Sequence, residues 1–446
     1  KSRGSSSVDG TLLQRRALVF DIIVKGGTLP DGRVLDIGIE GTRISAIDKN
    51  LTGPAQEVIE AQGDLVSPPF VDPHFHMDAT LSYGKPRLNK SGTLLEGISL
   101  WGELLEEATV EEMVDRGLAY CDWAVSMGLL AIRSHVDTTA DHLRTVEAML
   151  EVREQVKGYL DLQLVAFPQD GFFRAPNGRE NLLRALDLGL DVVGGIPHFE
   201  RTMEDGRRSV QELCRIAADR GLLVDMHCDE SDDPMSRHVE SLAAETTALG
   251  LQGRVVGSHL TSMHSMDNYY VSKLLPLMAE AGLQAISNPL INITLQGRHD
   301  SFPKRRGLTR VREMQAQGID VGWGQDCVRD PWYALGTADM LDVAFMGMHV
   351  AQMTSPEEMA RCFTMVTETN AKIMHLENYG LEVGKQASLV VLDAADPIDA
   401  LRLRPARLAV ISKGKLVSTQ PRADATINLP GRPTTKNRRH PITQSR

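Results

Sequence analysis

The chain has 446 residues, of which 42% are hydrophobic and 24% charged, an ordinary composition for one large globular domain or a large and a small one. No run approaches the roughly 18 uninterrupted apolar residues of a membrane span, and the formal net charge of −11 argues against a nucleic-acid surface. We therefore expect a cytoplasmic protein that binds neither membrane nor nucleic acid.

The two ends and the cysteines of the chain fit this expectation. Residues 1–16 are rich in Ser and Arg and are expected to form a disordered leader, with a transit-peptide remnant as the alternative. Residues 423–446 are expected to form a basic, solvated tail. The five cysteines are scattered without a C-x-x-C pair, which is typical of a reducing compartment.

Short alternating strands with turn signals dominate residues 17–68, as in "ALVFDIIVKGG". The same pattern returns at residues 380–422, as in "RLAVISKGKLVSTQ". Strands from both ends of the chain could therefore pair. We predict a small β-sandwich domain built from the two segments.

Between them, residues 69–379 alternate apolar runs with helical patterns such as "TVEEMVDRGLAYCDWAVSMG". Most of the runs are nearly continuous Val, Ile and Leu, as in strands buried on both faces. The eight runs are "PPFVDPHFH", "LLAIRSHVD", "DLQLVAFPQ", "DVVGGIPHF", "LLVDMHCDE", "RVVGSHLTS", "LQAISNPLI" and "IDVGWGQD". They predict an α/β fold with a (β/α)8 barrel. A doubly wound open sheet is the alternative, weakened because no G-x-G-x-x-G follows the first run.

Polar residues gather where these runs end, which is where barrels of this kind carry their chemistry. They are His74, His76, His135, Asp137, Gln169, His198, His227, Glu230, His259 and Asp326. Six of the thirteen histidines are among them. Random placement would scatter these side chains over helices and loops.

Zinc or ferrous iron prefers imidazole and carboxylate ligands with one position open for water. His74, His76, His227 and Asp326 would supply such ligands from three strands. No lysine that could bridge two metals ends the third or fourth run, and Gln169 stands at the third. We therefore predict one divalent transition ion, Fe2+ or Zn2+, per chain.

A bound ion lowers the pKa of its water and makes hydroxide available near neutral pH. Glu230, three residues after a predicted ligand, is placed to carry a proton between that water and a substrate. His259 could orient the hydroxide, and Asp326 could accept the water's proton. His135 and His198 are more simply explained as packing or supporting groups.

The sequence closely resembles the bacterial cytosine deaminases of the amidohydrolase superfamily. Stretches such as "FVDPHFHMD", "VDMHCDESDD", "SHLTSMHS" and "NPLINITLQGRHDSFPKRRGLTRVREM" carry the resemblance. It extends from about residue 20 to residue 420 and includes loops as well as the strand ends. It implies the barrel with a terminal β-sandwich, bound iron or zinc, and a homo-oligomer.

The resemblance also implies roles for single residues. His74, His76, His227 and Asp326 match the family's metal ligands, Glu230 its proton shuttle and His259 its hydroxide-orienting histidine. Gln169 matches the glutamine that reads the amide edge of the pyrimidine. Leu94 and Trp332 match walls of the pocket.

One position departs from the family, which usually has G-H-D-D where this chain has "GQDC". Asp326 is retained, and Cys327 replaces a second aspartate beside the base. A neutral thiol changes the charge and shape of the pocket. The predicted reaction is deamination of cytosine to uracil and ammonia. Isocytosine or an amino-triazine is the near alternative, and a cyclic-amide hydrolase or a non-catalytic barrel is a more distant one.

Overall fold

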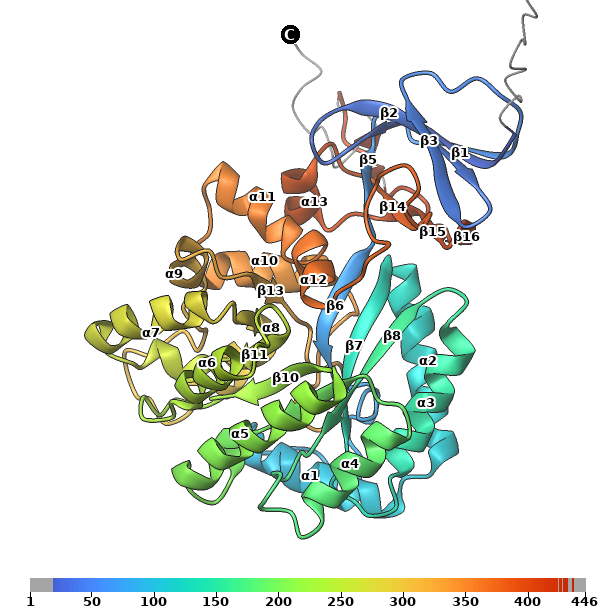
Figure 1. The fold of residues 1–446 in the computed structure, drawn as a ribbon. Helices are drawn as coiled ribbons and strands as arrows, with labels where there is room; N and C mark the ends of the chain where they lie inside the picture. The colour runs from blue at the N-terminus through green and yellow to red at the C-terminus, as the bar shows by residue number, and fades with distance from the viewer. Residues whose placement is uncertain (1–18, 424, 427, 432–434, 437–446) are drawn as a thin grey trace, which may run out of the picture.

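The computed structural model describes residues 19–423, 425–426, 428–431 and 435–436 (Figure 1). The leader predicted for residues 1–16 lies outside the described residues, as does most of the tail predicted for residues 423–446. No helix in the described ranges combines the length and apolarity needed to cross a membrane.

Eight parallel strands form the larger sheet, in the same order in space as along the chain. They are β6 (Phe70–Phe75), β7 (Leu129–Asp137), β8 (Asp161–Phe167), β9 (Val192–Gly195), β10 (Leu223–Cys228), β11 (Val255–His259), β12 (Gln284–Ser287) and β13 (Val321–Trp323). A parallel bridge between Phe75 and Asp326 brings the first strand against the end of the last and nearly closes the barrel. The predicted barrel is confirmed, and the open sheet is excluded.

Burial explains why the barrel strands could be recognised. All nine residues of β7 and all six of β6 are buried, because helices cover the outer face of the barrel and side chains fill its interior. Figure 1 shows these helices around the strands. The sequence runs therefore lack the alternation that is typical of one solvated face.

The helices begin and end at recognisable signals. Thr109 and Glu112 form a capping box at the start of α2, and Gly221 ends α5 with a φ of 69°. The helices are α1 (Leu94–Glu107), α2 (Val110–Ser126), α3 (Arg144–Val156), α4 (Gly178–Asp187), α5 (Met203–Arg220), α6 (His238–Ala248), α7 (Asn268–Glu280), α8 (Pro289–Leu295), α9 (Val311–Ala316), α10 (Met340–Val350), α11 (Pro356–Thr364), α12 (Glu368–Ile373) and α13 (Pro397–Leu403), with 3-10 turns η1 (Pro197–Phe199) and η2 (Thr261–His264).

A second, mixed sheet joins the two ends of the chain, as predicted. Its strands are β1 (Phe20–Thr28), β2 (Val34–Glu40), β3 (Arg43–Asp48), β4 (Ala55–Glu60), β5 (Leu65–Ser67), β14 (Leu389–Leu392), β15 (Arg407–Ser412) and β16 (Lys415–Ser418). The ends meet where β5 pairs antiparallel with β14. Ile22, Ile37, Leu389 and Ile411 belong to a core of its own. A two-stranded ribbon, β17 (Ala425–Thr426) with β18 (Thr435–Lys436), follows.

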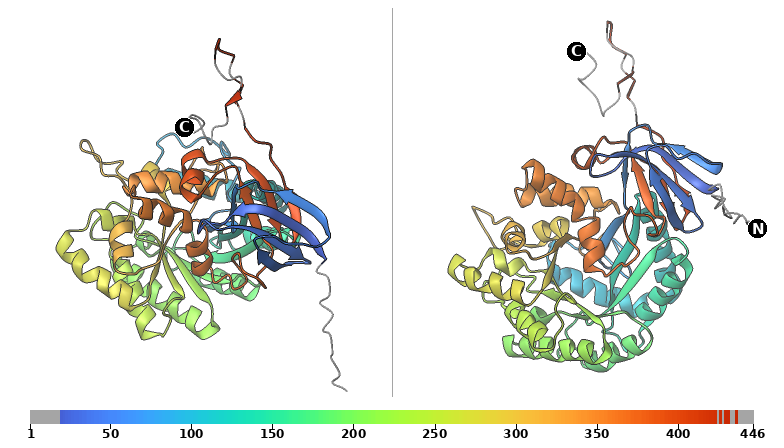
Figure 2. Two further views of the ribbon diagram at one scale, coloured as in Figure 1. Left: turned by 90° about the horizontal axis from the view of Figure 1, so that it is seen from above. Right: turned by 45° about the horizontal axis from the view of Figure 1, so that its top comes forward.

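The small sheet lies at the end of the barrel where β6 and β7 begin (Figures 1 and 2). Arg407 on β15 is buried there, donates from Nε to the carbonyl of Met127 at 3.0 Å, and forms an ion pair with Asp339. A buried ion pair that also satisfies backbone groups fixes this contact in one geometry. The carboxyl ends of the barrel strands remain free to build a site.

Candidate active site

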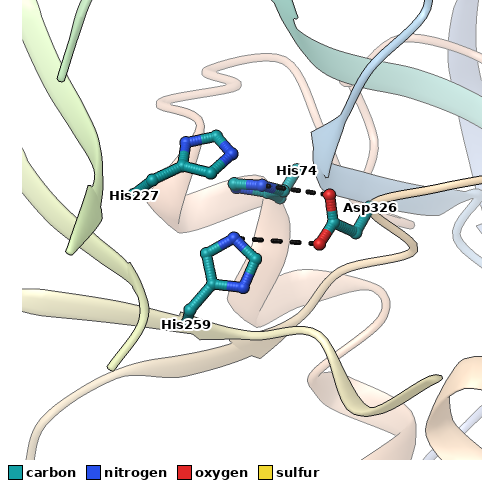
Figure 3. Close-up of side chains that lie close together, drawn as sticks. All are labelled: His74, His227, His259 and Asp326. Carbon is teal, nitrogen blue, oxygen red and sulfur yellow. Dashed lines mark ion pairs between the residues drawn. The ribbon is translucent and has the colours of Figure 1, made fainter. Parts of the chain in front are cut away.

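Four polar side chains converge at the carboxyl ends of the barrel strands (Figure 3). His74 (β6), His227 (β10), His259 (β11) and Asp326, just after β13, each offer one ligand atom, and these atoms all lie within 4.8 Å of one another. We call this group the His/Asp cluster. His74 Nε2 lies 3.5 Å from Asp326 Oδ1, and His259 Nε2 lies 3.7 Å from Asp326 Oδ2.

His76 lies at the edge of this cluster. Its Nε2 is 3.0 Å from Nε2 of His227 and 3.3 Å from Oδ1 of Asp326. The four residues predicted as ligands therefore converge on one place, together with His259. Two imidazole nitrogens and a carboxylate oxygen at such distances point at a common centre.

The donor atoms of the cluster suit a metal ion. His74 Nε2 is buried without a hydrogen-bond partner in the part of the chain that the structure describes, and His227 Nε2 lies 3.0 Å from another ring nitrogen, Nε2 of His76. Burial lowers the pKa of His227 and of His259 well below the usual value, so both rings are neutral and carry a lone pair. Neutral imidazoles with a carboxylate are the ligands of zinc and of ferrous iron.

The backbone at two cluster residues is left-handed. His259 has a φ of 70° and Asp326 a φ of 66°, a region that side-chain-bearing residues rarely adopt. Such conformations persist where the surrounding structure holds them, and they concentrate at functional sites. Here Asp326 is held by its backbone, which donates to the carbonyl of His74 at 2.8 Å.

Glu230 lies beside the cluster and is almost completely buried. Its Oε1 is 3.4 Å from Nδ1 of His259, and burial together with the charge of Asp326 raises its pKa well above the usual value. The preceding residue, Asp229, accepts hydrogen bonds from Ser236 Oγ at 2.7 Å and from the backbone of Val239 at 2.8 Å. These bonds fix the turn after β10 that carries Glu230.

Amides of the α8 region contact the same nitrogen of His259. Asn292 Nδ2 lies 2.9 Å from Nδ1 of His259, and Asn288 Nδ2 lies 3.3 Å from the same atom. Both asparagines are buried. Because these groups hold Nδ1, Nε2 of His259 keeps one orientation, 3.7 Å from Asp326 Oδ2.

A buried pocket opens onto these groups. Its lining consists of His76, Leu94, Gln169, Ile196, His227, Glu230, His259, Ile291, Leu295, Asp326, Cys327 and Trp332. Every residue predicted to contact a substrate is in this lining, as is Glu230. Ile196, Ile291 and Leu295 were missed, because polar strand ends mark a site in sequence whereas apolar wall residues look like ordinary core.

Cys327 forms part of an apolar wall of the pocket. It is buried and clusters with Ile291, Leu295 and Trp332. Burial and the neighbouring carboxylates of Asp326 and Asp330 raise the pKa of its thiol well above the usual value, so the thiol is neutral. The pocket therefore carries no charge at this position.

A model of the amidohydrolase family matches residues 57–419. The chain belongs to the amidohydrolase family. It is 40% identical, with a TM-score of 0.88, to the crystal structure of 5-methylcytosine deaminase from Klebsiella pneumoniae liganded with phosphonocytosine, which covers 92% of this chain and 100% of that chain. The predicted resemblance to the cytosine deaminases is confirmed.

Two curated relatives cover nearly the whole of this amidohydrolase. It is 30% identical over 410 residues to N-isopropylammelide isopropyl amidohydrolase of Pseudomonas sp. strain ADP, which covers 89% of this chain and 97% of the relative. It is 28% identical over 418 residues to pterin deaminase of Rhizobium rhizogenes, with 90% and 92% covered. The chain is thus an amidohydrolase-type deaminase or related hydrolase.

Besides His74, three strand-end residues lie outside the pocket lining of this amidohydrolase. His135 is buried with its ring centre 4.2 Å from that of His74. His198 lies on η1, where burial lowers its pKa to about 4. Asp137 accepts a hydrogen bond from Trp101 Nε1 at 2.8 Å. They surround the site without facing the cavity.

Trp332, a wall of the pocket, is held by two contacts that the sequence does not reveal. Asp330 Oδ1 accepts the backbone N–H groups of Trp332 and Tyr333, each at 2.9 Å. On the other side the indole lies against Gly97 of α1, where a Cβ would be 2.2 Å from Trp332 Cδ1. A glycine at position 97 is therefore needed for this approach.

We predict that Gly97→Ala destabilises the amidohydrolase by about 1–3 kcal/mol, because the added methyl group overlaps the indole. Gly102→Ala, in the same helix, is the matched control, since a Cβ there meets nothing within 4 Å. It should stabilise by about 0.5–1 kcal/mol through helix propensity. Urea unfolding measures both, and equal free energies of unfolding would contradict the close packing.

Proposed function

We propose that the protein is a mononuclear metal-dependent aminohydrolase that converts a cytosine-type base to the uracil-type product and ammonia. The observation that carries the proposal is one pocket lined by Glu230, by Gln169 and by three members of the His/Asp cluster, whose fourth member, His74, has its ligand atom within 4.8 Å of theirs. The 40% identity to a 5-methylcytosine deaminase supports it. We further propose that the preferred base carries an apolar substituent on the ring edge that faces Cys327.

His74, His76, His227 and Asp326 would hold the ion. His76 is included because its Nε2 lies 3.0 Å from His227 Nε2 and 3.3 Å from Asp326 Oδ1. His74 is included because its buried Nε2 has no hydrogen-bond partner among the described residues. These N and O donors suit Fe2+ and Zn2+ alike. When bound, the ion supplies a water molecule of lowered pKa as the nucleophile.

The protein's own residues carry the protons. Asp326 accepts the proton of the attacking water, and His259, fixed by Asn292, orients that water by a hydrogen bond. Glu230 lines the pocket 3.4 Å from His259 and donates a proton to the ring nitrogen next to the attacked carbon. The proton held by Asp326 then passes to the amino group as the C–N bond breaks, and the amino group leaves as ammonia. The hydroxyl proton of the tetrahedral intermediate returns to Glu230 as the carbonyl forms, so both carboxyl groups regain their starting states.

The pocket binds the base by shape and by its amide edge. Gln169 offers an amide that can pair with the N–C=O edge of a pyrimidine. Leu94 and Trp332 enclose the ring, while Ile196 and Ile291 exclude water from the reacting carbon. Excluding water strengthens each polar contact within the pocket.

Cys327 supports the substituted base. Its neutral thiol stands in an apolar wall with Ile291 and Leu295, and a methyl group on the ring would bury apolar surface there. A carboxylate at this position would instead favour a polar edge. Isocytosine and an amino-triazine, the alternative substrates, would place different chemical groups against this apolar wall. The homo-oligomer implied by the resemblance stays a prediction.

We expect purified protein to hold about one divalent transition ion per chain and to release ammonia from cytosine-type bases, faster from 5-methylcytosine than from cytosine. The measurement is a panel of cytosine, 5-methylcytosine, isocytosine, an amino-triazine and a pterin, with elemental analysis alongside. A chelator should abolish turnover and Zn2+ or Fe2+ restore it. Full activity without metal, or an amino-triazine as the best substrate, would overturn the proposal.

Glu230→Gln should keep the ion and lower kcat by roughly 10²- to 10⁴-fold, the usual contribution of a positioned proton donor. Gln fills the same space but cannot shuttle a proton. His227→Ala is the contrasting variant, because it removes a proposed ligand and should lose both ion and turnover. If Glu230→Gln loses the ion while His227→Ala keeps it, the assignment of roles is wrong.

Cys327→Asp should lower the ratio of kcat/KM for 5-methylcytosine to kcat/KM for cytosine, because it places a charge against the substituent. The expected loss corresponds to about 1–3 kcal/mol of transition-state stabilisation. Cys327→Ser is the control, since it stays neutral and should shift the ratio much less. Paired kinetics on the two bases measure both variants. An unchanged ratio in Cys327→Asp would show that Cys327 does not face the substituent.

A further inference from the structure

Behind the His/Asp cluster, a chain of buried polar side chains crosses the interior of the barrel. His74 Nδ1 lies 2.9 Å from Ser258 Oγ, and Ser258 Oγ donates to Asp225 Oδ1 at 2.6 Å. Arg133 Nη1 donates to Asp225 Oδ2 at 2.8 Å. All four side chains are completely buried, and they come from β6, β11, β10 and β7.

The direction of the hydrogen bonds between these side chains determines the tautomer of His74. A carboxylate paired with a buried guanidinium accepts hydrogen bonds, so the hydroxyl proton of Ser258 points to Asp225. The oxygen of Ser258 is then left to accept, and Nδ1 of His74 must carry the proton. Nε2 of His74 keeps its lone pair, and this is the atom that lies 3.5 Å from Asp326.

Arg133 connects this series of hydrogen-bonded side chains to the rest of the barrel. Its Nε donates to Gln163 Oε1 on β8 at 2.6 Å, and its Nη2 donates to the carbonyl of Ile373, the last residue of α12, at 3.1 Å. Every link therefore has a partner on rigid secondary structure. Such a network holds a ring far more precisely than a contact to a loop would.

We propose that Ser258, with Asp225 and Arg133 behind it, is a positioning residue that sets the tautomer and direction of His74 so that Nε2 faces the metal. The inference rests on the proposed metal-dependent function. Hydrogen bonds to the second nitrogen of a ligand histidine commonly contribute 10- to 100-fold in metal affinity. Losing the serine hydroxyl frees the ring to rotate and to exchange tautomers.

The test is the Zn2+ affinity of the metal-stripped protein, measured against a competing chelator, with the visible absorption of the Co2+ form as a second readout. Ser258→Ala should bind Zn2+ about 10- to 100-fold more weakly and change the Co2+ spectrum. Ser258→Thr, which keeps the hydroxyl, should restore both. If the alanine variant does not fold, Ser258→Cys fills the space with a weak hydrogen-bonding group and should show the same loss.

Ser287→Ala is the matched control. Ser287 lies on the neighbouring strand β12, is completely buried, and its hydroxyl has no hydrogen-bond partner among the described residues. The Zn2+ affinity of Ser287→Ala should stay within about twofold of the parent's. This is a smaller change than the loss of at least about 10-fold that we expect for Ser258→Ala. An unchanged affinity and Co2+ spectrum in Ser258→Ala overturn the positioning role while the proposed function stands. A parent protein that binds neither ion overturns the proposed function itself.

Discussion

The site depends on the contact that closes the barrel between its first strand and the end of its last. Asp326 donates its backbone N–H to the carbonyl of His74 at 2.8 Å, and His76 donates to the carbonyl of Asp326 at 3.1 Å. Residues about 250 positions apart in the chain are thereby locked within hydrogen-bond distance. The left-handed backbone of Asp326 turns its carboxylate toward the histidines. Without this closure the carboxylate and the H-x-H pair would lie at opposite edges of an open sheet.

A barrel interior that contains so many polar groups has to satisfy them, because an unpaired buried polar atom costs free energy. Two arrangements are visible. Below the cluster, Arg133, Asp225 and Ser258 satisfy one another in a connected network. At the cluster itself, His74 Nε2 is left without a hydrogen-bond partner in the described structure. The unpartnered nitrogen of His74 faces the carboxylate of Asp326 at 3.5 Å, and an ion held between them would satisfy both.

The pocket is lined by both polar and apolar side chains. Glu230, His259 and Asp326 are among its polar lining residues, and Cys327, Ile291 and Leu295 belong to one apolar cluster. Trp332 also lines the pocket. Asp330 accepts a hydrogen bond from its backbone N–H, and its indole packs against Gly97, where there is no side chain. The two curated relatives have names that refer to different heterocycles. We therefore expect the apolar wall to determine which heterocycle the pocket accepts.

Local patterns in the sequence were enough to predict the barrel, the small sheet from both ends, and the convergence of the polar strand ends. The reason is that parallel strands buried on both faces read as continuous apolar runs, and that their carboxyl ends share one edge. Tertiary structure alone decided the rest. Asp225 and Arg133 look like charges within strands until the barrel buries them against Ser258. Ile196 and Ile291 look like core, and Gly97 looks like any helical glycine, until the fold brings them to the pocket and its tryptophan. Their roles depend on neighbours distant in the chain, which no local pattern encodes.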